Sequence, residues 1–370
     1  MKERDNDEYS VQGGYSIINL PGDHVARGCY DHYEDGEARL LKWLYYYAIG
    51  NRWSWKTFTE EVGLRAEEIG NVLTGKPNTD GHLTTVIKYA KELREKVGSE
   101  VPHYAKTSFA KEIVGALNTA REALEAGDWG IVFVAGESGC GKTCVGRGWN
   151  VENNHGVSQF YEFDNGGGKK HVIQQLAGLN NINRWLSYTD TVERLQDCFR
   201  YSPRVLIIDE PHLMLEGRIR HLDTIEYLRR LADITHSVIV FLATMDRFQA
   251  ALAETAYNDV QFWRRCLQKL LLNRHGTAKD IETVFAFRCP GLTLDEKLLD
   301  VLTLINEHEK GGFGMVNTVI SNAHRFARRT KEKLTRTHLL VAAKDEVDSL
   351  DAIQKAMGSS VGRSLPRRRR

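Results

Sequence analysis

The sequence has 370 residues with a formal net charge of +1, and 42% of the residues are hydrophobic. This length favours two or three domains with a sizeable core, and the composition is ordinary for a soluble protein. The near-neutral charge argues against a protein that coats DNA by bulk charge. No apolar run approaches the ~20 residues of a membrane span, and the charged first residues are not a signal peptide.

The six cysteines show no C-x-x-C pairing. This pattern favours reduced thiols over a zinc site or a disulfide framework. We therefore expect a cytoplasmic protein with no membrane partner.

The chain begins with a predicted irregular arm over residues 1–35, followed by an all-helical domain over residues 36–100. Within this domain two short helical stretches meet at Gly63, with apolar residues at helical spacing on both sides. The layout is typical of a helix-turn-helix, because glycine permits the left-handed turn between the two helices.

The start of the second short helix would enter the major groove in such a motif. Arg65 and Asn71 suit guanine and adenine edges there, whereas Glu67 and Glu68 would repel phosphates. DNA binding and a helical bundle that contacts proteins are therefore both open interpretations of this domain.

An apolar run over residues 131–135 leads into a G-x-x-x-x-G-K-[ST] sequence, the phosphate-binding loop of nucleotide hydrolases. Backbone N–H groups of such a loop point inward at a helix N-terminus, where they bind anions. Lys142 would reach the β- and γ-phosphates, and the Thr143 hydroxyl would ligate Mg²⁺. We expect ATP or GTP to be held by Gly136, Glu137, Ser138, Gly139, Cys140, Gly141, Lys142, Thr143 and Cys144.

A second apolar run, over residues 205–208, ends in the two carboxylates Asp209 and Glu210. After a phosphate-binding loop, this pattern predicts that Asp209 holds Mg²⁺ through water and that Glu210 polarises the attacking water. A third core strand, over residues 237–243, ends in Thr244, which we interpret as a γ-phosphate sensor. A threonine that merely ends the strand is the alternative.

Four basic residues in two predicted loop regions are interpreted as contacts to DNA phosphates. Lys169 and Lys170 follow a triple glycine, and Arg218 and Arg220 follow the acidic strand end. An ordinary solvated turn is the alternative for the two lysines.

Two further arginines, Arg264 and Arg265, lie in a segment interpreted as helical. In a ring or filament, an arginine there reaches the nucleotide of the neighbouring subunit, and plain surface arginines are the alternative.

The remaining sequence predicts a last strand over residues 283–287 and helices throughout residues 293–357. The expected domains are an α/β core over residues 104–290, a helical lid over 291–357 and a basic tail over 358–370.

The ordered motifs resemble those of an AAA+ ATPase. This implies a P-loop NTPase of the α/β class with a parallel central sheet and a C-terminal helical lid, preceded here by the all-α helix-turn-helix domain. With that domain included, residues 37–357 resemble the MuB, TnsC and TniB family of transposition regulators. The resemblance implies an ATPase that uses ATP and Mg²⁺ and assembles as a ring or helical filament on double-stranded DNA. It also implies a transposase partner, with hydrolysis driving disassembly.

The resemblance also assigns roles to residues at the matching motif positions. The Walker A pair is Lys142 and Thr143, the Walker B pair is Asp209 and Glu210, the sensor-one residue is Thr244, and the trans-acting finger is Arg264 or Arg265. One position departs from the family, because Met315 stands where a sensor-two arginine is often found. Slow basal turnover would follow from that departure.

Two other functions fit part of the pattern. A helicase loader or replication-initiation factor would use the same ATPase with a different partner. A transcription regulator would use ATP only as a ligand switch, but Glu210 argues against it, because a switch needs no water-activating carboxylate.

Overall fold

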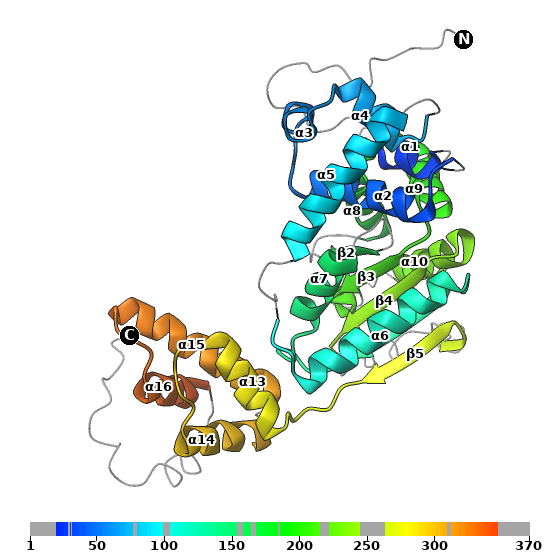
Figure 1. Cartoon of the computed structure of the whole chain (residues 1–370). Helices are drawn as coiled ribbons and strands as arrows, with labels where there is room; N and C mark the ends of the chain where they lie inside the picture. The colour runs from blue at the N-terminus through cyan, green and yellow to red at the C-terminus, as the bar shows by residue number, and fades with distance from the viewer. Residues whose placement is uncertain are drawn as a thin grey trace. The chain divides into compact units, whose positions relative to one another are not determined.

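The computed structural model describes residues 20–28, 30, 32–76, 80–98, 104–153, 158–163, 168–183, 186–214, 222–244, 263–308 and 312–346 (Figure 1). The chain divides into two compact units, each assembled from three stretches of sequence. The first unit comprises Met1–Val101, Leu117–Phe133 and Trp149–Lys269. The second unit comprises Pro102–Ala116, Val134–Gly148 and Leu270–Arg370.

The first unit opens with a cluster of helices around an aromatic core. The helices are α1 (Gly22–Arg27), α2 (Asp35–Gly50), α3 (Trp55–Val62), α4 (Ala66–Leu73) and α5 (Asp80–Gly98). Trp43, Tyr45, Trp55 and Phe58 are fully buried in this core. Between α3 and α4, Gly63 has φ 76°, so the two predicted short helices are present with a left-handed residue between them. The expected irregular arm ends earlier than predicted, because helix α1 lies within residues 20–28 and buries Val25.

A five-stranded parallel sheet forms the centre of the fold, in the order β2-β3-β4-β1-β5. Its strands are β1 (Gly130–Ala135), β2 (Ser158–Glu162), β3 (Val205–Asp209), β4 (Val238–Ala243) and β5 (Cys266–Leu271). Every residue of β1, β3 and β4 is buried, which explains their continuous apolar sequences. The pairing aligns Glu162 of β2 with Asp209 of β3, and Asp209 with Leu242 of β4. The predicted parallel α/β fold is confirmed.

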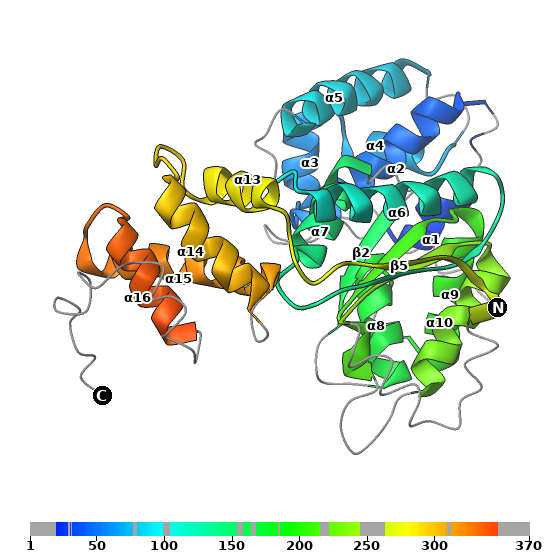
Figure 2. The same ribbon diagram turned by 90° about the horizontal axis from the view of Figure 1, so that it is seen from below.

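Helices flank the sheet in the first unit. Helices α8 (Lys169–Leu179), α9 (Tyr188–Tyr201) and α10 (Leu222–Thr235) lie together on one side of the strands (Figure 2). A short 3₁₀ helix, Pro211–Met214, follows β3. Helices α6 (Ser108–Glu125) and α7 (Lys142–Asn153) are joined near their ends by a hydrogen bond from Trp149 Nε1 to Asn118 Oδ1, 3.0 Å.

Four further helices that pack on one another lie in the described part of the second unit. They are α13 (Ala278–Arg288), α14 (Glu296–Glu307), α15 (Phe313–Thr330) and α16 (Arg336–Glu346). The strand predicted over residues 283–287 is wrong, because these residues belong to α13. A capping box between Thr277 and Asp280 starts this helix, and Ile281, Val284 and Phe285 bury one helical face.

The segment after Trp263 also differs from its prediction. Residues 263 and 264 are helical, but Cys266–Leu271 forms strand β5 in place of the expected helix. Exposed and half-buried residues alternate along β5, with Leu267 and Leu271 both more than 40% exposed. This period of two identifies a half-buried edge strand.

One buried arginine ties the N-terminal helices to the sheet within the first unit. Arg204, directly before β3, is 1% exposed. Its guanidinium donates to the hydroxyl of Tyr46 on α2 at 2.8 Å and to Asn180 Oδ1 after α8 at 3.0 Å. Further bonds reach the carbonyl oxygens of Ser202 and Cys198. The charge is thus satisfied by dipoles, and it also lies over the rings of Tyr46 and Phe199.

The buried surroundings of Arg204 disfavour a second positive charge nearby. Burial, reinforced by the Arg204 charge, lowers the pKa of Lys42 on α2 to about 8.

None of the described helices has the length and apolar character needed to cross a bilayer.

Arg204→Met should destabilise the first unit by about 3 kcal/mol, because Asn180 and Tyr46 would lose a buried donor. Urea unfolding followed by tryptophan fluorescence measures this loss, with Trp43 and Trp55 buried in the same unit. Arg200→Met is the control, because Arg200 is 49% exposed and pairs only with Asp197 among the contacts described for it. It should cost less than about 1 kcal/mol. Equal losses in the two variants would contradict a structural role for the buried guanidinium.

Candidate functional site

The predicted phosphate-binding loop connects the end of β1, at Ala135, to the start of α7, at Lys142. Gly139 and Gly141 have φ values of 85° and 94°, a backbone conformation that glycine adopts without strain. Lys142 is only 5% exposed, and its ammonium donates to the carbonyl oxygens of Gly136 at 2.7 Å and Glu137 at 2.8 Å. The loop therefore folds around its own lysine.

This geometry creates a preformed site for an anion. Helix α7 is 12 residues long, and its free N–H groups and positive dipole end lie at the loop. Lys142 adds a buried positive charge whose partners among the described residues include two carbonyls and the Cys140 sulfur at 3.6 Å. A phosphate group supplies the negative charge that such a site lacks. Thr143 is half-buried and Cys144 is exposed beside it.

Helix α15 of the same unit packs directly against this loop. A Cβ atom added to Gly314 would lie 1.9 Å from the Ser138 carbonyl oxygen, and one added to Gly139 would lie 2.6 Å from Gly314 Cα. One turn further along, Asn317 Nδ2 donates to the Gly139 carbonyl at 3.0 Å. The start of α15 therefore lies so close to the loop that a side chain at Gly139 or Gly314 would collide with the opposite backbone.

An ion pair fixes the other side of the loop. Arg274, which follows β5, places its Nε 3.1 Å from Glu137 Oε1. The Arg274 carbonyl also accepts from the N–H of Phe313, the first residue of α15. Arg274 therefore connects the loop to α15, because its side chain pairs with Glu137 and its carbonyl oxygen accepts from Phe313.

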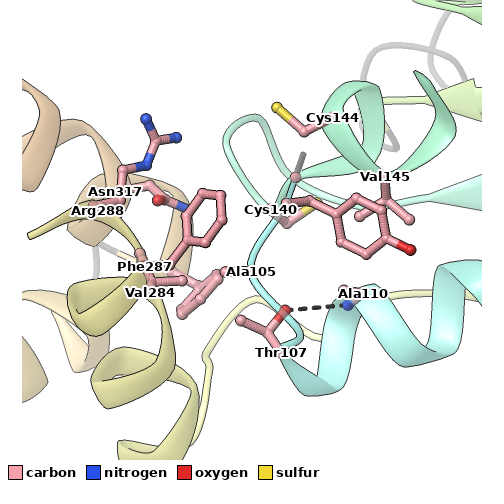
Figure 3. A pocket seen from close by; sticks show the side chains of 13 residues that line it. Ala105, Thr107, Ala110, Cys140, Cys144, Val145, Val284, Phe287, Arg288 and Asn317 are labelled. Atoms are coloured by element: carbon pink, nitrogen blue, oxygen red, sulfur yellow. Dashed lines mark hydrogen bonds between the residues drawn. The ribbon is translucent and has the colours of Figure 1, made fainter. Parts of the chain in front are cut away.

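A small cavity lies beside the loop within the second unit (Figure 3). Val284, Phe287 and Arg288 of α13 line one side, and Cys140, Cys144 and Val145 line the other. Ala105 and Thr107, from the segment before α6, and Ala110, in the first turn of α6, also line the wall. The cavity has a volume of about 50 Å³ and is lined mostly by apolar atoms.

Sequence reasoning found the loop but missed the lid residues around it. The sequence puts Met315 where a sensor-two arginine is often found, and the structure puts Met315 in the first turn of α15. Two polar side chains that do reach the loop are Asn317 and Arg274. No local motif marks these residues, because Asn317 meets the loop through the packing of α15 and Arg274 through the course of the chain after β5.

The second predicted site, in the first unit, lies at the end of β3. Asp209 is 1% exposed, and Glu210 directly after it has φ 55°, which is uncommon for a residue with a side chain. Glu210 is held by His212, whose buried Nε2 lies 3.1 Å from Glu210 Oε2. Backbone strain of this kind is concentrated at functional sites. His212 was missed because a histidine two residues after a carboxylate has no motif value by itself.

The other predicted catalytic residues are described only in part. Thr244 is half-buried directly after β4. Arg264 is exposed, whereas Arg265 lies 3.8 Å from Asp233 of α10 through its Nε. Of the two candidates for the arginine finger, Arg265 is the one that takes part in a described ion pair.

The predicted DNA contacts divide into three groups. Lys169 and Lys170 form the first turn of α8, where Lys170 is exposed. Arg65 is engaged by Glu68, which accepts from its Nε at 2.8 Å, and the carboxamide oxygen of Asn71 is buried. A base contact by Arg65 would compete with its ion pair to Glu68, although the Arg65 side chain is 78% exposed. Arg218 and Arg220 lie outside the described residues.

Comparisons with known proteins support the fold. A family model described as an AAA domain matches residues 126–252. No curated protein matches the sequence closely enough to count as a relative. The ORC2 protein of Aeropyrum pernix, solved in ADPNP–ADP complexes, is 14% identical with a TM-score of 0.53, covering 68% of this chain and 71% of that chain. Its ADP form is 15% identical with a TM-score of 0.51, covering 68% and 72%. The chain therefore has the AAA+ P-loop fold that its sequence predicted.

Gly314→Ala should destabilise the second unit by about 1–3 kcal/mol, because the new methyl group would collide with the Ser138 carbonyl. Calorimetry of the thermal transition measures the loss. Gly115→Ala in α6 of the same unit is the matched control, since nothing lies within 4 Å of its added Cβ. That variant should be neutral or more stable by up to about 1 kcal/mol. If both variants melt like the parent, the close approach of α15 to the loop is absent in solution.

Proposed function

We propose that this chain binds and hydrolyses ATP and that it assembles on double-stranded DNA to regulate transposition. The observation that carries the ATP proposal is the loop closed around Lys142, where a buried ammonium and the start of α7 converge on one anion site. The AAA+ P-loop fold supports the same conclusion, since the ORC2 protein of similar fold was solved with ADPNP and ADP.

The cavity beside the loop is the proposed site of the nucleotide base. It adjoins the phosphate-binding residues Cys140 and Gly141, and the apolar side chains Val284 and Phe287 would cover a base. At about 50 Å³ the cavity is smaller than the ~300 Å³ of common ligand pockets. Binding must therefore widen it, which requires α13 or the segment around Ala105 to move outward.

The donor chemistry of the predicted residues suits magnesium. Thr143 offers a hydroxyl and Asp209 a carboxylate, and Mg²⁺ prefers oxygen ligands of this kind. When bound with ATP, the ion would neutralise charge on the phosphates.

Glu210 is the proposed base that polarises the attacking water. His212, 3.1 Å away, is the proposed positioning residue, because it holds this carboxylate.

Assembly on DNA and a transposase partner are proposed from the sequence resemblance to the MuB, TnsC and TniB family. Thr244 would sense the γ-phosphate, and Arg264 of a neighbouring subunit would complete the site. Lys169, Lys170, Arg218 and Arg220 would contact the DNA backbone, which gives little sequence preference. A helicase-loading or replication-initiation ATPase is the second candidate, and the likeness in fold to the ORC2 protein is compatible with it.

Glu210→Gln should lower the rate of ATP hydrolysis by about 100-fold or more, because an amide cannot accept the proton of water. Binding of a fluorescent ATP analogue should stay within a few-fold of the parent, and phosphate release measures the rate. Glu193→Gln removes an exposed carboxylate on α9 of the same unit and should leave both quantities unchanged. Parental hydrolysis by Glu210→Gln would remove Glu210 from the mechanism.

Electron microscopy tests the assembly. With duplex DNA and ATP the protein should form rings or filaments, and without nucleotide it should not. Lys142→Ala, which removes the buried ammonium of the loop, should form none under either condition. Single particles of one chain in every condition would refute assembly on DNA.

The two candidate functions differ in the partner. Affinity capture from the native host should recover a transposase if the first proposal is right. Recovery of a replicative helicase without a transposase would favour the second.

A further inference from the structure

We propose that the lid carries a separate binding site for the phosphate backbone of DNA, at the end of α15 remote from the phosphate-binding loop. The inference rests on the proposed function in that DNA is the ligand. The site, here called the lid basic patch, consists of Arg325, Arg328, Arg329, Lys331, Lys333 and Arg336. Within residues 325–336 the only carboxylate is that of Glu332.

The helical geometry places the three arginines of α15 on its outer side. Val319, Ile320, Ala323 and Ala327 are buried on one face of the helix. At 100° per residue, Arg325, Arg328 and Arg329 fall opposite that buried face, and all three are exposed. Their spacing of three and four residues brings neighbouring side chains to within roughly 5–6 Å at Cβ.

The remaining members of the patch follow the three arginines directly in the sequence. Lys331 caps α15 in the left-handed conformation, with φ 57°, and Lys333 lies exposed in the short connection to α16. Arg336 begins α16, which packs against α15. The patch therefore runs from the last turns of α15, through the connection, to the start of the packed helix α16.

These cations are not consumed by partners within the described part of the chain. None of the ion pairs described there involves a patch residue, and the one nearby carboxylate, Glu332, is bonded to His338 at 3.0 Å. The Nε atom of Arg336 is buried without a hydrogen-bond partner among the described residues. A buried donor of this kind carries a cost that an external oxygen acceptor would remove.

Stabilisation of the C-terminus of α15 accounts for only part of the positive charge in the patch. Arg328 and Arg329 lie in the last turn, where cations favour the helix C-terminus by roughly 0.3–1 kcal/mol each. Arg325 is too far from the end for this effect, and Lys333 and Arg336 follow the helix. The surplus points to an external polyanion.

The surface chemistry favours DNA over an acidic protein. The exposed large hydrophobic residues among those described include none between 325 and 336. Protein interfaces usually bury an aromatic or aliphatic core, whereas phosphate backbones are bound by arginine and lysine without one. The arginine guanidinium also suits bidentate contact with phosphate oxygens.

Helix α15 connects the lid basic patch to the phosphate-binding loop. Helix α15 is one element of 18 residues, about 27 Å long, whose first turns contact Gly139 of the phosphate-binding loop. Gly314 and Asn317 touch the loop at one end, and Arg325, Arg328 and Arg329 lie at the other. DNA that shifts this helix would change nucleotide affinity, and nucleotide would change DNA affinity by the same factor.

The test compares two double variants of the full chain with equal loss of charge. Arg325→Gln with Arg329→Gln removes two patch cations and leaves Arg328 at the helix end. Lys279→Gln with Lys297→Gln removes two exposed lid lysines outside the patch. Binding to a 30-base-pair duplex of arbitrary sequence is followed by fluorescence anisotropy over a range of NaCl concentrations. The basic tail, residues 358–370, is unchanged in every variant, so its contribution to DNA binding cancels in the comparison.

The patch variant should bind DNA about tenfold or more weakly, with the slope of log affinity against log salt reduced in magnitude by about 2. The lysine variant should retain the parental affinity and slope. Lys333→Gln, which lies outside the helices, should reduce the slope by about 1 and keeps the test valid if the double variant unfolds. With saturating DNA, the parent should bind the fluorescent ATP analogue with altered affinity, and the patch variant should show less of this change.

Equal DNA binding by the patch and lysine variants would overturn the proposal. Loss of binding to an acidic peptide with DNA binding intact would also overturn it and assign the surface to a protein. Failure of the ATPase proposal looks different, because Lys142→Ala would then bind the ATP analogue like the parent. If no variant nor the parent binds DNA at low salt, both the patch and the proposed assembly on DNA are refuted.

Discussion

The second unit is organised around one constraint, the burial of the Lys142 ammonium inside its own loop. A buried charge must be solvated by fixed dipoles, and here the carbonyls of Gly136 and Glu137 do so at 2.7 and 2.8 Å. Those carbonyls can turn inward only because Gly139 and Gly141 take left-handed φ values. The same compact loop leaves room for the start of α15, which contacts it through two glycines. A larger residue at either position would separate the lid helix from the loop.

The first unit has a comparable arrangement along strand β3. Arg204 precedes the strand and is bonded to Tyr46 of the N-terminal helices, and Asp209 and Glu210 stand at its other end. Four fully buried residues, Val205–Ile208, separate the two features. The N-terminal helices are thus attached to the element that presents the predicted catalytic carboxylates.

Predictions from sequence succeeded where the signal is local in the chain. The phosphate-binding loop, the acidic end of β3 and the fully apolar strands β1 and β4 depend on residues within one turn or one strand. They failed where local propensity competed with capping and packing. Residues 283–287 resemble a strand because Val284, Phe285 and Phe287 favour β structure, yet the capping box at Thr277 places them in a helix. Strand β5 was missed because it follows the helical residues Trp263 and Arg264 almost directly. The alternation of half-buried and exposed residues along Cys266–Leu271 became visible only in the structure.

The sequence by itself determined that the chain has an AAA+ P-loop fold and which residues form its phosphate-binding loop, because a motif of eight neighbouring residues fixes its own backbone. Only the tertiary structure revealed Asn317 and Arg274 at that loop, His212 beside Glu210, and Arg204 beneath the N-terminal helices. Each of these contacts joins residues by burial or by helix packing. Asn317 and Gly139 are 178 residues apart, so no pattern along the chain records that they meet.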